Sequence, residues 1–183
     1  MRLLAIFSLP FLLALPAAAG PWFTHEFGEK RSYHQDFLAV CADNGAGPCR
    51  AVQYLFDPAN PSSFGKGFFG VARLAVHGST NGPAVEIYML ALPDDPVGPF
   101  ELILDGRTLD IPEASWSRVT PEGNNVAESV SILKGEAADV LVAGMKRGFF
   151  LTFKAPEAEA VFSLRGLTSA LNAIEQLEQK ESH

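Results

Sequence analysis

Short apolar runs, separated by glycine- and proline-rich turns, dominate this chain from residue 36 onward. Most of them are too short for a helix and contain β-branched or aromatic residues, which is typical of strands. The pattern predicts strands at residues 36–41, 49–56, 67–77, 85–92, 100–104, 107–111, 126–133, 149–154 and 160–164. So many short strands predict a mostly β fold, either an antiparallel β-sandwich or a flattened barrel.

The clearest local signal is Asp105-Gly106, which separates two runs of alternating apolar and polar residues. A two-residue Asp-Gly loop tolerates positive φ at both central positions and matches the twist of the strands that it joins. The predicted hairpin places two apolar pairs on one face and an acidic pair on the other: Leu102 with Leu109, Phe100 with Ile111, and Glu101 with Asp110.

Two segments have helical rather than strand spacing. Residues 136–147 begin with acidic side chains and end in Lys146-Arg147-Gly148, as expected for a short internal helix, although Gly144 costs it about 1 kcal/mol. Residues 168–179 predict a C-terminal helix that docks on the sheets. The predicted core-facing residues are Ala137, Val140, Leu141 and Met145 in the first helix, and Leu167, Leu171, Ile174 and Leu177 along the second.

The other segments lack a sustained period. Residues 20–35 mix aromatic and charged residues, and we expect an N-terminal arm with one short edge strand. Residues 57–63 have loop composition, and a second loop is expected from Trp116 through Pro121 to Asn125.

The N-terminus has the order of a secretory signal peptide. Arg2 is followed by an apolar stretch from Leu3 to Leu15, and the small residues before Gly20 suit cleavage between Ala19 and Gly20. The stretch is too short to span a bilayer, so no stable membrane anchor is expected after cleavage. We therefore expect residues 1–19 to be a signal peptide, residues 20–183 to form a single β-rich domain, and the product to be periplasmic or secreted.

The charge of the chain excludes several classes of partner. Its formal net charge is -7, and removal of residues 1–19 takes away Arg2 and no acidic residue. A chain without a basic cluster does not gain the counterion release that drives binding to nucleic acids. DNA, RNA and anionic lipid are therefore not expected as partners.

Cys41 and Cys49 are the only cysteines. An even count in an exported chain favours a disulfide, here across a hairpin whose turn spans residues 43–48. Closing so short a loop stabilises a fold by about 2–3 kcal/mol in the chain-entropy model. A redox or metal pair would call for closer spacing or further ligands.

Two groups of residues offer candidate chemistry at histidines. Histidine and carboxylate in the arm suit a metal, but nothing fixes their spacing, so we expect a solvated arm and no cofactor or metal; these residues are His25, Glu26, His34 and Asp36. A hydrolase would need a base, a hydroxyl nucleophile and an acid within reach; the candidates are His77, Ser79, Thr80, Asp94 and Asp95.

Acidic, glycine-rich and aromatic groups are weaker candidates. Glycoside chemistry needs two carboxylates in a cleft, and the pairs to consider are Asp94 with Asp95, Glu101 with Asp110, and Glu157 with Glu159. Residues 65–70 lack the spacing of a phosphate loop and predict a strand entry. Fourteen phenylalanines favour a buried core over a sugar platform, unless Trp22 and Trp116 lie exposed side by side.

Three stretches resemble the invasion-associated locus B family of exported Gram-negative proteins: Asp36-Phe37-Leu38-Ala39-Val40-Cys41 with Cys49, Lys146-Arg147-Gly148-Phe149-Phe150-Leu151, and Phe162-Ser163-Leu164-Arg165-Gly166-Leu167-Thr168-Ser169-Ala170-Leu171. A related group of periplasmic domains ends with the same strand-to-helix signature. The chain departs from the family at Phe37, where tryptophan is usual, and lacks its second cysteine pair. The resemblance implies no catalytic residue.

The resemblance implies an exported, non-enzymatic envelope protein that binds an envelope or host protein, or another surface component. Two alternatives remain: a small-ligand carrier with an apolar, lipid-sized cavity between the sheets, and a periplasmic hydrolase that uses His77 with Ser79 or a nearby carboxylate.

Overall fold

The computed structural model describes residues 20–56, 71–78, 82–89, 101–119, 130–155 and 158–181. The predicted signal peptide, the loop at 57–63 and the glycine-rich residues 65–70 lie outside them, as do parts of the strands predicted at 67–77, 85–92 and 126–133. Cleavage between Ala19 and Gly20 therefore stays a prediction.

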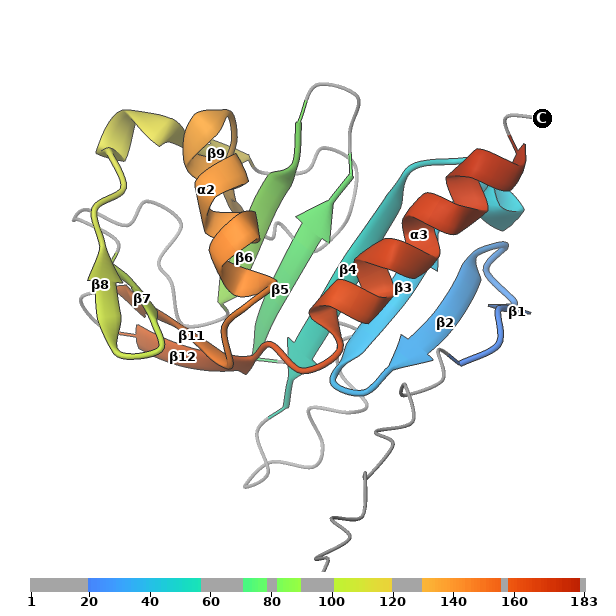
Figure 1. Ribbon diagram of the computed structural model, residues 1–183, viewed down its shortest axis with the longest axis horizontal. Coiled ribbons are helices and arrows are strands. Elements are labelled where there is room, and N and C mark those ends of the chain that lie inside the picture. The colour runs from blue at the N-terminus through green and yellow to red at the C-terminus, as the bar shows by residue number, and fades with distance from the viewer. Residues whose placement is uncertain are drawn as a thin grey trace, which may run out of the picture.

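The described strands form two antiparallel sheets (Figure 1). The large sheet has the order β1-β2-β3-β4-β5-β6-β10-β9. Its strands are β1 Phe23–Thr24, β2 Lys30–His34, β3 Phe37–Cys41, β4 Cys49–Leu55, β5 Ala72–His77, β6 Ala84–Met89, β9 Trp116–Val119 and β10 Val130–Leu133. The small sheet has the order β12-β11-β7-β8. Its strands are β7 Glu101–Leu104, β8 Arg107–Leu109, β11 Phe150–Ala155 and β12 Ala158–Ser163.

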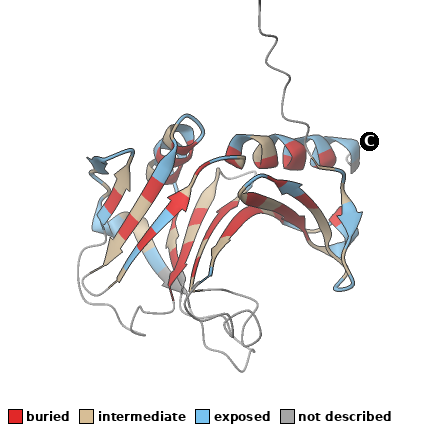
Figure 2. Ribbon diagram, turned by 90° about the horizontal axis from the view of Figure 1, so that it is seen from below, coloured by how far each residue is buried: buried red, intermediate tan, exposed pale blue. Residues whose placement is uncertain are grey.

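Both helices lie over one face of the large sheet (Figures 1 and 2). α2 (Glu136–Met145) lies over β6, and α3 (Leu167–Glu181) crosses β2, β3 and β4. The inward face of the small sheet joins them in one core cluster, which includes Phe37, Phe153 and Phe162. The predicted mostly β fold with an internal and a C-terminal helix is confirmed, and of the two architectures the structure is sandwich-like rather than a closed barrel.

The Asp-Gly hairpin was predicted in the correct register. Leu102 is the Cα partner of Leu109, and Asp105 and Gly106 both have positive φ, at 50° and 82°. Glu101 and Asp110 are exposed, while Leu102 is buried. Phe100 lies outside the described residues.

The structure also joins Cys41 to Cys49, as predicted. The two residues are partners in the β3–β4 register, and both are buried. A 3-10 turn, η1 (Asp43–Gly45), connects the strands.

Residues 20–35 are not a solvated arm. Besides the short edge strand β1, they contain β2, which pairs with β3 along its length. Ser32 and His34 are buried on the face of β2 that α3 covers. The prediction failed because these inward positions are polar, so the segment shows no apolar alternation.

Two further predictions need correction. Trp116 begins strand β9 rather than lying in a loop, and it packs edge-on against Phe153 with 6.2 Å between ring centroids. Val140 is 67 % exposed, because α2 is rotated so that Ala138 and Val142 are buried instead. Packing explains the glycine at position 144 in this helix, because a Cβ there would come within 2.9 Å of the Leu104 side chain.

Candidate functional site

Three segments far apart in sequence meet beside the first turn of α3. They are the turn after β2, the connection from α2 to β11, and the connection from β12 to α3. These segments contain much of the sequence that resembles the invasion-associated locus B family. Asp36 links the first segment to the third: its carboxylate accepts hydrogen bonds from Arg165 Nε and Nη2 at 3.0 Å each and from Ser163 Oγ at 2.6 Å. The bonds from Arg165 and Ser163 hold the pKa of Asp36 below its usual value.

Gly166 allows this junction to close. Its φ is +88°, and a Cβ at this position would lie 1.9 Å from the carbonyl oxygen of His34. Because that neighbour is backbone, any larger residue would force the β2–β3 turn away from α3.

His34 is the buried polar residue of the junction, with 3 % of its surface exposed. Its Nδ1 lies 2.9 Å from Ser169 Oγ in the first turn of α3, whereas its Nε2 is buried with no hydrogen-bond partner among the described residues. Burial lowers the pKa of His34, which favours the neutral imidazole. His34 therefore has one ring nitrogen without a described partner.

A groove of about 740 Å³ opens along this junction; we call it the α3 groove. Phe149, which is 70 % exposed, lies on it together with His34, Lys146, Arg165 and the first residues of α3. The position of Phe149 is fixed through its backbone, because its N–H donates to the carboxylate of Asp105, at 3.0 Å from Oδ1. The groove thus combines an exposed aromatic ring with polar groups in a firmly bonded frame.

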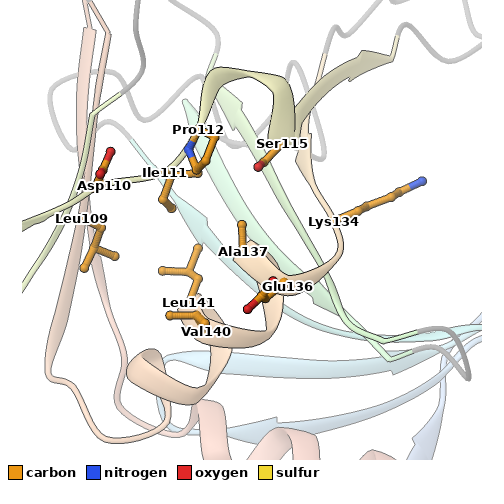
Figure 3. A pocket seen from close by; sticks show the side chains of 10 residues that line it. All are labelled: Leu109, Asp110, Ile111, Pro112, Ser115, Lys134, Glu136, Ala137, Val140 and Leu141. Atoms are coloured by element: carbon orange, nitrogen blue, oxygen red, sulfur yellow. The ribbon is translucent and has the colours of Figure 1, made fainter.

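A second hollow, of about 420 Å³, lies between α2 and the segment after β8 (Figure 3). Leu109 and Ile111 lie on one side and Ala137, Val140 and Leu141 on the other, while the side chain of Lys134 points away (Figure 3). Exposed Val140 therefore lies at an apolar hollow.

A third hollow, of about 450 Å³, includes the predicted hydrolase base His77. Nε2 of His77 lies 3.1 Å from Glu86 Oε2, and Arg73 Nη2 donates to Glu86 Oε1 at 2.7 Å. Burial alone would raise the pKa of Glu86, but the hydrogen bond from His77 and the charge of Arg73 hold it at about 2. Ser79, Thr80, Asp94 and Asp95 lie outside the described residues, so the structure describes an acid beside His77 and no nucleophile.

The candidate metal ligands of residues 25–36 are not brought together. His25 lies in the β1–β2 turn, where its Nδ1 accepts from the N–H of Phe27, whereas His34 is at the other end of β2 and Asp36 binds Arg165. Across the described ranges, no group of three or more His, Cys, Asp or Glu residues could hold a metal ion.

The other candidates also have ordinary structural partners. Glu101 Oε1 accepts from Thr108 Oγ1 at 3.0 Å, and Glu159 pairs with Lys154 at 3.4 Å, while Glu157 lies outside the described residues. Trp22 and Trp116 are partly buried, near the β1 and β9 edges of the large sheet, so they form no joint platform. Only some of the described phenylalanines belong to the core, namely Phe37, Phe153 and Phe162. The exposed ones are Phe23, Phe27, Phe56, Phe149 and Phe150.

The fold and the α3 groove define an antiparallel two-sheet domain with a surface groove at a helix N-terminus. Compared with family models, with curated proteins and with solved structures, the chain matches none of them. Within the described part of the chain, no helix has the length and apolar character needed to cross a membrane.

Proposed function

We propose that this chain is an exported, non-enzymatic envelope protein that binds an envelope or host protein through the α3 groove. The observation that carries the proposal is the exposed ring of Phe149 beside a groove whose frame is tightly hydrogen-bonded. Aromatic side chains, Phe among them, are enriched in the cores of protein–protein interfaces, and a preorganised surface lowers the cost of association.

The rigidity of the frame also supports binding. The bonds around Asp36, Arg165 and Ser163 hold the start of α3 against the β2–β3 turn, so little ordering entropy is lost on association. The resemblance to invasion-associated proteins supports the same class of function.

The test is site-specific photocrosslinking in an envelope-containing host, with a benzophenone amino acid at position 149. The matched control position is Phe27, which is also exposed, at 58 %, and precedes the opposite end of β2 from His34. We expect a discrete crosslinked protein from position 149 and none from position 27. With that protein purified, Phe149→Ala should weaken binding about tenfold or more, and Phe27→Ala should not.

The same adducts from both positions would contradict the proposal. So would turnover of esters, peptides or glycans by the purified chain that is lost in His77→Gln, since it would favour the hydrolase. Near-UV circular dichroism of each variant checks that the fold is retained.

A further inference from the structure

The α3 groove differs in charge from the rest of the chain. Its lining includes Lys146 and Arg165 and contains no Asp or Glu, although the chain has 21 acidic residues against 14 basic ones. Lys146 is exposed and has no ion-pair partner among the described residues. Arg165 is paired with Asp36 but keeps 69 % of its side chain exposed.

The N-terminus of α3 adds positive potential at the same place. Its first turn has no acidic residue, and the backbone N–H groups of Thr168 and Ser169 have no acceptor within the described ranges. Free amides at the start of a helix carry a partial positive charge and favour an anion.

His34 supplies an independent observation. It lies against the start of α3 through Ser169, it lines the groove, and its Nε2 has no partner among the residues described. A buried polar atom that lacks a partner costs free energy, and binding recovers that cost only where it rearranges the junction so that Nε2 gains a partner.

Two carboxylates beside the groove are already hydrogen-bonded within its frame. Asp36 is occupied by Arg165 and Ser163, and Asp105 accepts from the N–H groups of Phe149 and Phe150. Asp36 offsets the charge of Arg165, so the cation left without a described ion-pair partner at the groove is Lys146, beside the free amides of α3.

We infer that the α3 groove takes an extended acidic segment of a protein partner. A carboxylate of that segment lies at the start of α3 near Lys146, and a neighbouring apolar side chain packs on Phe149. This inference rests on the proposed function and names the chemistry of its partner: charge complementarity selects an acidic sequence, and the exposed ring requires an apolar residue beside the acid.

The test uses a fluorescent peptide of alternating glutamate and leucine, and its counterpart with glutamine in place of glutamate. Polarisation is measured with the exported full-length product and three variants. Asn172 is exposed, lines the groove and has no described hydrogen bond, so Asn172→Glu and Asn172→Lys change charge without breaking a bond. Gln179→Glu, on the same helix but outside the groove, is the matched control.

We expect the glutamate peptide to bind at least about tenfold more tightly than the glutamine peptide. Asn172→Glu should weaken its binding about threefold to tenfold, Asn172→Lys should strengthen it similarly, and Gln179→Glu should change it less than about twofold. Raising the salt from about 50 to about 300 mM should weaken binding.

Equal binding of the two peptides, no binding of either, or equal effects of Asn172→Glu and Gln179→Glu would overturn the inference. The proposed function is judged separately, because the crosslink at position 149 does not depend on peptide charge. A specific crosslink from position 149 together with equal binding of the two peptides overturns only the inference of an acidic partner. Absence of the crosslink overturns both this inference and the proposed function.

Discussion

Replacing Gly166 with alanine should destabilise this fold more than any other single methyl group added at a described glycine. The residue has φ +88°, a region that costs a non-glycine residue about 1 kcal/mol. The new Cβ would also lie 1.9 Å from the His34 carbonyl oxygen, so the β2–β3 turn must move by about 1 Å. Overpacking of this kind costs about 1–3 kcal/mol more, which gives a total of about 2–4 kcal/mol.

Two other glycines serve as matched controls. Gly28 has φ +71° with nothing within 4 Å of a Cβ, so Gly28→Ala should cost the conformational term alone, about 1 kcal/mol. Gly78 has neither the positive φ nor a close neighbour, and Gly78→Ala should be neutral or slightly stabilising.

The measurement is urea unfolding followed by circular dichroism, with thermal melts as a second readout. We expect Tm to fall by roughly 5–15 °C for Gly166→Ala and by about 2–4 °C for Gly28→Ala. If Gly166→Ala is no worse than Gly28→Ala, β2 and α3 do not approach as closely as described, and the frame of the α3 groove is wrong.

The remaining predictions concern the disulfide, two buried ionisable groups and the leader. Cys41→Ala with Cys49→Ala should lower the free energy of unfolding by about 2–3 kcal/mol, and a reductant should then have no further effect. The pKa of Glu86 is about 2 in the folded chain and 4.5 in its unperturbed state. The ionised Glu86 therefore stabilises the fold fully above pH 4.5, and this contribution is lost as the pH falls toward 2. Glu86→Gln should lower the free energy of unfolding by about 2–3 kcal/mol at neutral pH and flatten its pH dependence in acid titrations. The pKa of His34 is lowered in the folded state, so as the pH drops below about 6.5 the unfolded chain takes up a proton first and the free energy of unfolding decreases. Urea titrations at several pH values should show that His34→Gln removes this decrease and that His25→Gln does not. Intact mass and N-terminal sequencing of the exported protein should show Gly20 as its first residue, and a retained leader would contradict the predicted cleavage.

The parts of the fold that were predicted correctly depend on local chemistry. Asp105-Gly106 specifies its turn through two residues that tolerate positive φ, and the register of Leu102 with Leu109 follows from that turn. The pairing of Cys41 with Cys49 likewise involves a short hairpin with no competing cysteine.

The parts that were missed depend on distant partners. Val140 was assigned to the core because apolar residues occur on both sides of Leu141 along the helix. Which of the two sides is buried depends on how α2 packs against Leu104 and β6, and this packing buries Val142 and leaves Val140 exposed. Ser32 and His34 gave no strand signal, because the residue that accommodates His34 is Ser169, 135 positions later.

The α3 groove could not be predicted for the same reason. Asp36 meets Arg165 across 129 residues, and neither residue has a local pattern that points to the other. Both residues lie in the stretches that resemble the invasion-associated family, but that resemblance indicates no contact between them.

The order of strands in the large sheet has a consequence for the order in which the chain folds. β1 to β6 pair in succession, so this meander can form from neighbouring segments before the C-terminal elements dock. Its inward face, with Leu74, Val76 and Ile87, stays uncovered until α2, the small sheet and α3 pack on it. A chain folded only as far as β6 would expose this apolar face, so a chaperone would be needed most before the helices dock.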